Sequence, residues 1–372
     1  MADSCLSDVF NFSAGPAAIP ETVLQRARDE LLTRGTSFPS LMEVPFSSAA
    51  FRTIADQAHQ RLSALLALPD NYRILFMAGG AMAQFGLLPL NLLGSSKRLA
   101  YVDSGYWASR AITEARRFAT VDIVASAWRD DEGVHLPAPK SWGLETLDRG
   151  VAYCHYTANE TADGAQFPEL HEHSSSDVAV VCDMTSSFLA RPLDVSRYGL
   201  IYAGAQKNIG PAGLTVVLVR DDLLGRSAPQ TPDVFNYGLQ SEARSCRNTP
   251  PTFAVGLANL VFEWIADNGG LSAMARHNDE KSAMVYRTIA ESCGFYRCPV
   301  APGSRSGINV CFTLPDEALT ERFIVEAEEN GLHHLRGHSR IGGIRASFYN
   351  AVPHAAAVAL SQFMKDFQAR RG

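Results

Sequence analysis

The sequence lacks the marks of several protein classes. Its 372 residues include no stretch of about 18 apolar residues, so no membrane-spanning helix is expected. The net charge of −6 comes without a run of like charges, which argues against a basic surface for nucleic acid. The opening residues MADSCLSDVFNFS show no basic segment followed by an apolar one, so we expect no signal peptide and a cytoplasmic location. With 46% hydrophobic residues, the chain can bury a large core.

Cysteine usage gives no sign of a disulfide framework or a metal centre. Seven cysteines is an odd number, and none forms a C-x-x-C pair or stands at a spacing typical of zinc ligands. Several lie within apolar runs, such as Cys154 in VAYCHY and Cys182 in VVCDM. We therefore expect reduced, buried cysteines and no metal site.

Helical patterns alternate with short apolar runs through the first two thirds of the chain. Strands that are apolar throughout and separated by helices predict a mostly parallel sheet, buried on both faces, in an α/β domain. Helices are expected over residues 21–35, 49–68, 81–93 (interrupted at Pro89) and 107–118, and strands over 73–80, 98–105, 120–126, 151–157, 177–187, 200–208 and 214–224.

The pattern changes from about residue 252. Helices over 252–268 and 271–292 lead to a strand, a helix, a second strand and a final helix, which predicts a smaller α+β domain. The N-terminal residues could belong to either unit. We place the large domain at 16–258 and assign 1–15 and 259–372 to the small domain.

Glycines and polar residues gather where the expected strands end. The segments are AGGAMAQ, SGYW, YTANET, CDMTSS and GAQKN. Open parallel sheets bind ligands beyond the carboxyl ends of their strands, so these five segments predict one site.

Two titratable residues among these strand ends indicate the chemistry. Lys207 is one of only five lysines and follows the apolar run IYAGAQ, where burial would lower its pKa and suit a Schiff-base amine. The alternative is a lysine that reaches out of a loop to solvent. Asp183 ends the run DVAVVCD, where a carboxylate needs a cation such as the pyridinium nitrogen of pyridoxal phosphate. Its alternative role is to cap the segment that follows.

Two further strand ends offer weaker signals. Gly79 and Gly80 precede a helix and could seat a phosphate on free backbone N–H groups, although a glycine pair is often only a turn. Trp107 could stack on a planar ring or simply pack at a helix start.

Longer motifs show a resemblance to a known family. The segments FNFSAGPAAIP, SRYGLIYAGAQKNIGPAGLTVVLVRDDLLG, NTPPTFAVGL and GGIRASFYNAVP, in that order, resemble the phosphoserine aminotransferase family of class V. The resemblance covers residues 10–370. It implies the fold-type I architecture with pyridoxal phosphate as cofactor. It also implies amino transfer between an α-amino acid and an α-keto acid in a homodimer with shared active sites.

The resemblance also implies roles for individual residues. Lys207 would form the Schiff base, Asp183 would hold the pyridine nitrogen and Trp107 would stack on the ring. The other implied contacts are Thr161 to the ring hydroxyl, Gln206, Gly80 and Ala81 to the cofactor phosphate, Asn248 and Thr249 to that phosphate from the other subunit, and Arg345 to the substrate α-carboxylate.

The sequence departs from the family pattern where a substrate phosphate would bind. After MEV the family usually has Ser-His-Arg, but this chain has Pro45-Phe46-Ser47. A later Gly-His-Arg is here Gly337-His338-Ser339, so the histidine remains and the arginine does not. A third arginine is replaced by Met82.

These departures predict a less cationic substrate pocket, and hence an aminotransferase whose substrate carries no phosphate. Three alternatives stay open. One is a true phosphoserine aminotransferase acting on 3-phosphohydroxypyruvate and glutamate in serine biosynthesis, with Arg336 or Arg340 as the replacement ligand. The others are a pyridoxal-phosphate-dependent lyase, racemase or decarboxylase, and a binding protein without activity.

Overall fold

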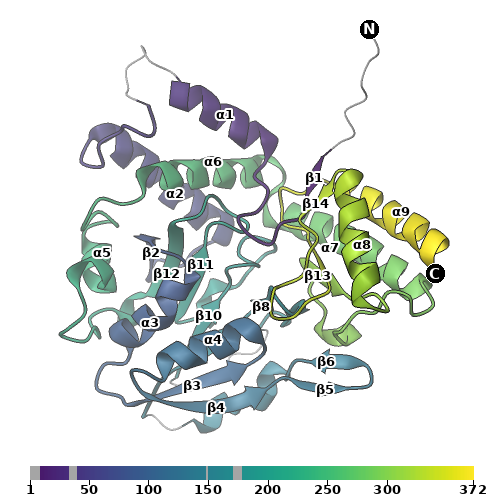
Figure 1. Cartoon of the computed structure of the whole chain (residues 1–372). Coiled ribbons are helices and arrows are strands. Elements are labelled where there is room, and N and C mark those ends of the chain that lie inside the picture. Colours follow the sequence, from purple (N-terminus) through teal and green to yellow (C-terminus); the bar gives the residue numbers. More distant parts are fainter. Residues whose placement is uncertain (1–8, 33–39, 148–149, 171–177) are drawn as a thin grey trace.

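A seven-stranded sheet forms the centre of the larger part of the molecule (Figure 1). The computed structural model describes residues 9–32, 40–147, 150–170 and 178–372. All strands run parallel except β12, which is antiparallel to both of its neighbours. The order across the sheet is β2 (Tyr72–Ala78), β12 (Leu214–Arg220), β11 (Leu200–Gly204), β10 (Ala179–Asp183), β7 (Val151–Thr157), β3 (Arg98–Asp103) and β4 (Thr120–Ser126).

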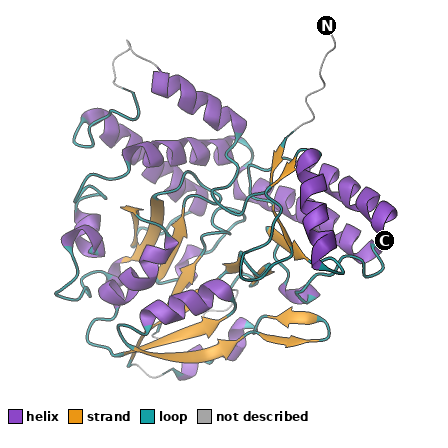
Figure 2. Ribbon diagram, in the orientation of Figure 1, coloured by secondary structure: helices purple, strands orange, loops and turns teal. Residues whose placement is uncertain are grey.

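The central strands of the sheet are buried on both faces, which explains their apolar sequences. Every residue of β10 and β11 is buried, and successive side chains contribute to opposite hydrophobic clusters. Figure 2 shows the helices on the two sides of the sheet. One cluster includes residues of α1 (Glu21–Leu32), α2 (Ala49–Leu66) and α6 (Thr252–Asp267), and the other includes residues of α3 (Ala81–Leu92), α4 (Tyr106–Ala115) and α5 (Tyr237–Glu242).

A separate hydrophobic cluster joins the C-terminal elements to Phe12. The short strand β1 (Phe10–Asn11) pairs with β14 (Leu332–His333), so the described N-terminal residues lie against the C-terminal third of the chain. The other elements of this part are α7 (Gly270–Glu291), β13 (Asn309–Phe312), α8 (Glu317–Glu329), β15 (Ile344–Ser347) and α9 (His354–Arg371). The domain boundaries given above stay a prediction.

The sheet and the longer helices confirm the expected α/β architecture, with several differences. The helix over 81–93 continues through Pro89 as one element, Ala81–Leu92. Short elements were missed: the hairpins β5 (Trp128–Asp130) with β6 (Gly133–His135) and β8 (Asn159–Glu160) with β9 (Ala165–Gln166), the helix α5, and the 3-10 turns Pro139–Trp142, Leu144–Thr146, Val195–Arg197, Asp221–Leu223, Asp233–Phe235 and Pro302–Ser304.

Other expectations fall partly outside the described residues. Gly35, the expected end of the first helix, and Cys5 are among them. Cys154, Cys182 and Cys311 are buried as expected, but Cys246 and Cys298 are half-buried, and Cys293 is exposed because it follows the C-terminus of α7. No helix among the described residues is long and apolar enough to cross a membrane.

Candidate active site

A cavity of about 230 Å³ lies where the parallel strands of the sheet end. The structure brings together in it seven residues that the sequence analysis assigned to a site, from five separate strand ends. The lining residues are Gly80, Ala81, Met82, Trp107, Thr157, Asn159, Thr161, Asp183, Thr185, Ser186, Gln206 and Lys207.

Lys207 lies just beyond β11 and points into this cavity. Its Nζ donates a hydrogen bond to Thr161 Oγ1 at 3.0 Å and stands 5.5 Å from the centroid of the Trp107 ring. Burial lowers the pKa of Lys207 to about 8, with a further decrease from the charge of Arg345 and an opposing increase from Asp183. A substantial fraction of the amine is therefore neutral near physiological pH, as a nucleophilic lysine requires.

Asp183 is the last residue of β10 and is 5% exposed. The backbone N–H of Thr185 donates to its Oδ1 at 2.9 Å. Burial raises the pKa of Asp183, while hydrogen bonds from Thr185 and Tyr202 and the charge of Lys207 lower it. A buried carboxylate beside the cavity favours a cationic partner there.

Two acidic side chains hold the helix that carries Trp107. Glu160 accepts hydrogen bonds from Trp107 N at 2.9 Å and Ala108 N at 3.0 Å, and Asp163 accepts from Tyr106 N at 3.0 Å. These carboxyl groups accept hydrogen bonds from backbone N–H groups at the N-terminus of α4, which would otherwise lack partners. Burial and the neighbouring Asp163 raise the pKa of Glu160 to about 8. These hydrogen bonds hold the backbone of Trp107 in place and so set the position of its indole ring.

The helix α3 begins at the cavity with an open N-terminus. Gly80 is its N-cap and provides no side-chain hydrogen bond, and a Cβ built on Gly80 has no heavy atom within 4 Å. The buried Gln206 Oε1 nearby has no partner among the described residues. Free backbone N–H groups at a helix N-terminus are suited to an anion such as a phosphate.

The residues of the cavity fit pyridoxal phosphate. Lys207 supplies an amine of lowered pKa, and Asp183 supplies a buried carboxylate for a ring nitrogen. Trp107 supplies an aromatic face, and the start of α3 supplies a seat for the phosphate. The buried Thr157 Oγ1 and Trp107 Nε1 have no partner within the described chain, which leaves polar groups available to a ligand.

Arg345 and His338 lie beside the cavity. Arg345 is on β15, and its Nη1 donates to the carbonyl oxygen of Thr161 at 3.2 Å. The His338 ring is 4.4 Å from that of Tyr106 and 6.1 Å from that of Trp107. Burial and the charges of Arg345 and Lys207 lower the pKa of His338, so its imidazole is mainly neutral at pH 7.

Seven residues expected at the site are absent from the lining of the cavity: Arg345 and His338, described above, and Asn248, Thr249, Phe46, Ser47 and Ser339. Asn248 and Thr249 are exposed, and Asn248 Oδ1 accepts a hydrogen bond from Gln240 Nε2 at 3.1 Å. Phe46 is half-buried and packs against the large hydrophobic cluster, and Ser47 is exposed. None of these four residues lines the cavity of its own chain.

The residues that follow β14 supply no cation to the lining of the cavity. Ser339 and Arg340 are exposed and absent from it. Arg336 is exposed and forms an ion pair with Glu321, with Nη2 2.7 Å from Oε2.

Sequence reasoning missed several polar residues of the site. Thr157 ends β7, Asn159 begins β8, and Thr185 and Ser186 follow β10; the segments YTANET and CDMTSS that contain them were assigned to the site, but these four residues were given no individual role. Glu160 stands in the motif YTANET, but its role depends on α4, which is more than 40 residues earlier in the sequence.

Comparisons with known proteins agree with this geometry. A family model described as Aminotransferase class-V matches residues 9–358. The phosphoserine aminotransferase of Laribacter hongkongensis is 48% identical over 364 residues, covering 98% of this chain and 99% of that protein. A solved phosphoserine aminotransferase from Bacillus circulans subsp. alkalophilus superposes with a TM-score of 0.92 at 40% identity, covering 98% of this chain and 99% of that one. The pyridoxal-phosphate-bound enzyme of Trichomonas vaginalis gives 0.88 at 37%, covering 96% and 99%.

Proposed function

Because the chain belongs to the phosphoserine aminotransferase family of class V, we propose that it transfers the amino group between phosphoserine and an α-keto acid. The enzyme class is that of pyridoxal-phosphate-dependent aminotransferases. The assignment of phosphoserine as the substrate rests on the sequence identity of 45–48% to phosphoserine aminotransferases over 98–99% of this chain. The comparisons thus favour phosphoserine over the phosphate-free substrate expected from the departures in sequence.

Three residues of the cavity, Lys207, Asp183 and Trp107, have tasks in this proposal. Pyridoxal phosphate, when bound, supplies a ring that stabilises negative charge at the substrate Cα. Lys207 Nζ binds the cofactor covalently and moves the proton at that carbon, which its pKa of about 8 permits. Asp183 keeps a proton on the ring nitrogen through its buried carboxylate. Trp107 orients the ring and helps to exclude water.

Arg345 provides the binding site for the substrate α-carboxylate. Its guanidinium lies beside the Thr161 carbonyl, and the Thr161 hydroxyl contacts Lys207. Thr161 thus contacts both the guanidinium that binds the carboxylate and the amine of Lys207. A planar guanidinium can hold a carboxylate through two parallel hydrogen bonds, which sets the orientation of the amino acid over the ring.

Two observations support a second substrate class, an amino acid with a smaller, uncharged or apolar side chain. Met82 lines the cavity, and Arg336 is engaged with Glu321. A phosphate dianion removed from water needs several fixed cations, and each charge-assisted contact contributes about 1.5–3 kcal/mol. Loss of two such contacts would reduce phosphoserine turnover by roughly 10³-fold.

Steady-state kinetics of the holoenzyme tests both candidates. We expect kcat/KM for L-phosphoserine, with 2-oxoglutarate as acceptor, to exceed that for L-alanine and L-serine by at least about a hundredfold. A higher value for a neutral amino acid would contradict the proposal and favour the second class.

A variant carrying Phe46→His, Ser47→Arg and Ser339→Arg sharpens this comparison. If phosphoserine is already the substrate, this variant changes its kcat/KM only a few-fold, whereas a phosphate-free substrate predicts a rise of roughly 10³-fold for phosphoserine. The exposed Ser95→Arg, before the start of β3, controls for added charge alone.

A homodimer with shared sites belongs to the same proposal. Asn248 and Thr249 are exposed and outside the cavity of their own chain, so they are free to reach a cofactor phosphate in a neighbouring chain. A cytoplasmic location, expected from the sequence, is likewise proposed.

A further inference from the structure

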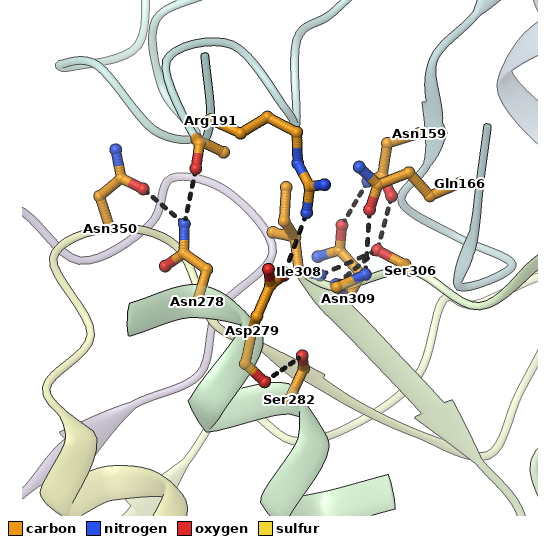
Figure 3. A network of polar contacts seen from close by, with 12 residues as sticks. Asn159, Gln166, Arg191, Asn278, Asp279, Ser282, Ser306, Ile308, Asn309 and Asn350 are labelled. Atoms are coloured by element: carbon orange, nitrogen blue, oxygen red, sulfur yellow. Dashed lines mark hydrogen bonds and ion pairs between the residues drawn. The ribbon is translucent and has the colours of Figure 1, made fainter. Parts of the chain in front are cut away.

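A buried chain of amide and hydroxyl groups joins the floor of the cavity to the strands that carry Arg345. Its centre is the pair Asn159 and Asn309, drawn in Figure 3, in which Asn159 Nδ2 donates to Asn309 Oδ1 at 2.7 Å. Asn309 Nδ2 in turn donates to Ser347 Oγ at 2.9 Å. Ser306 Oγ donates to Asn159 Oδ1 at 2.6 Å. The two asparagines are 150 residues apart in the sequence.

Each side-chain nitrogen and oxygen of this asparagine pair has at least one hydrogen-bond partner. Asn159 Nδ2 also donates to Ser186 Oγ at 2.7 Å, and Asn309 Nδ2 approaches Tyr349 Oη at 3.4 Å. Asn159 is 2% exposed and Asn309 is fully buried. A buried polar network with all its groups paired holds a single geometry, because any displacement leaves an unpaired donor or acceptor away from water.

The hydrogen bond between Asn159 and Asn309 links β8 to β13, and each end of this link lies close to a residue of the site. Asn159 stands two residues before Thr161, and Ser347 stands two residues after Arg345. The pairing of β13 with β15 places Asn309 opposite Ser347. Arg345 Nη1, on β15, meets the Thr161 carbonyl at 3.2 Å, which makes a second link between the segment of Asn159 and the paired strands β13 and β15.

We propose that Asn309 is a positioning residue that fixes Arg345 relative to Lys207 and thereby prepares the site for a substrate α-carboxylate. The inference rests on the proposed role of Arg345. Asn309 does not line the cavity, and it acts through Ser347 and β15. A displacement of about 1 Å between two groups that hold one substrate lowers reactivity by roughly 10²-fold, so such a tie has a large effect on binding and rate.

The variant Asn309→Ala tests this role in the holoenzyme. The dissociation constant for L-phosphoserine comes from the concentration dependence of the absorbance change of bound cofactor, and that for pyridoxal phosphate comes from titration of the cofactor-free protein. We expect the first constant to rise about tenfold or more and the second to change less than about twofold. The matched control is Asn91→Ala, which removes another buried, fully hydrogen-bonded asparagine near the end of α3 away from the cavity.

A double-mutant cycle with Arg345→Ala separates positioning from general destabilisation. If Asn309 acts through Arg345, adding Asn309→Ala to Arg345→Ala causes no further loss of L-phosphoserine affinity. Additive losses, or equal weakening of pyridoxal phosphate binding, would overturn the inference. Ser347→Ala, which removes a single hydroxyl, gives a milder form of the same shift if Asn309→Ala does not fold.

The outcomes also distinguish this inference from the proposed function. If Arg345→Ala leaves the affinity for L-phosphoserine unchanged, carboxylate docking on Arg345 is wrong and the role of Asn309 is wrong with it. If Arg345→Ala weakens binding while Asn309→Ala and Ser347→Ala do not, the role of Asn309 alone is wrong.

Discussion

Replacing Lys207 by methionine in the cofactor-free protein is expected to increase the free energy of unfolding. In the wild type, folding places an ammonium group in a site that lowers its pKa from 10.5 to about 8. A shift of this size corresponds to about 3 kcal/mol of destabilisation when the group is charged in both states. Because the side chain is partly exposed, water screens part of this penalty, and we expect a gain of about 1–3 kcal/mol at pH 7.

The pH dependence of this gain identifies its cause. Below pH 8, Lys207 is protonated in both the folded and the unfolded state, so the burial penalty is fully present. Between pH 8 and 10.5 the folded protein loses the proton while the unfolded chain keeps it, so the stability of the wild type rises relative to the variant. The advantage of Lys207→Met should therefore shrink as pH rises through this window.

Urea unfolding at one fixed protein concentration, at pH 7, 8.5 and 10, measures the effect. Lys97→Met, an exposed lysine, is the control and should show no such pH-dependent gain. The reasoning is refuted if Lys207→Met is no more stable than the wild type at pH 7, or if its advantage is the same at all three pH values. The same variant should also lack the reducible covalent bond to pyridoxal phosphate in the loaded protein.

Two further predictions concern the cofactor site and its assembly. Asp183→Asn should lower turnover by roughly a hundredfold or more, because it removes the charge that holds the ring nitrogen protonated, while borohydride still traps cofactor on Lys207. Near wild-type turnover in that variant would leave Asp183 only a capping role. Mixing inactive Lys207→Ala with inactive Asn248→Ala should restore activity through hybrid dimers, and an active monomer by sedimentation would contradict shared sites.

Local patterns were sufficient to predict the framework of the site. The run that ends in Asp183 is buried on both faces, so its apolar character identifies a central strand. The polar residues just beyond such strands then meet at one edge of the sheet, which brought Lys207, Asp183 and Trp107 to one cavity.

The interactions that refine the site join residues far apart in the chain. Glu160 holds α4 from a position more than 50 residues away from Trp107, and Asn309 meets Asn159 across 150 residues. No local periodicity encodes such pairs. The hairpin of β5 and β6 was missed for another reason, because β5 is three exposed residues long and offers no apolar alternation.

The pairing of β1 with β14 has a consequence for biosynthesis. From β1 the chain runs past Gly15, where an added Cβ would lie 3.5 Å from Lys207 Cε, to Ala17, whose N–H donates to the Gln206 carbonyl at 2.9 Å. At about 5–20 residues per second, the ribosome makes Leu332 roughly 15–65 s after Phe10. The segment that contains β1 therefore cannot pair until β14, near the end of the chain, has been synthesised. We expect the surroundings of Lys207 to be completed only when translation is nearly finished, so ribosome-bound chains stalled before β14 should retain pyridoxal phosphate less well than the complete chain.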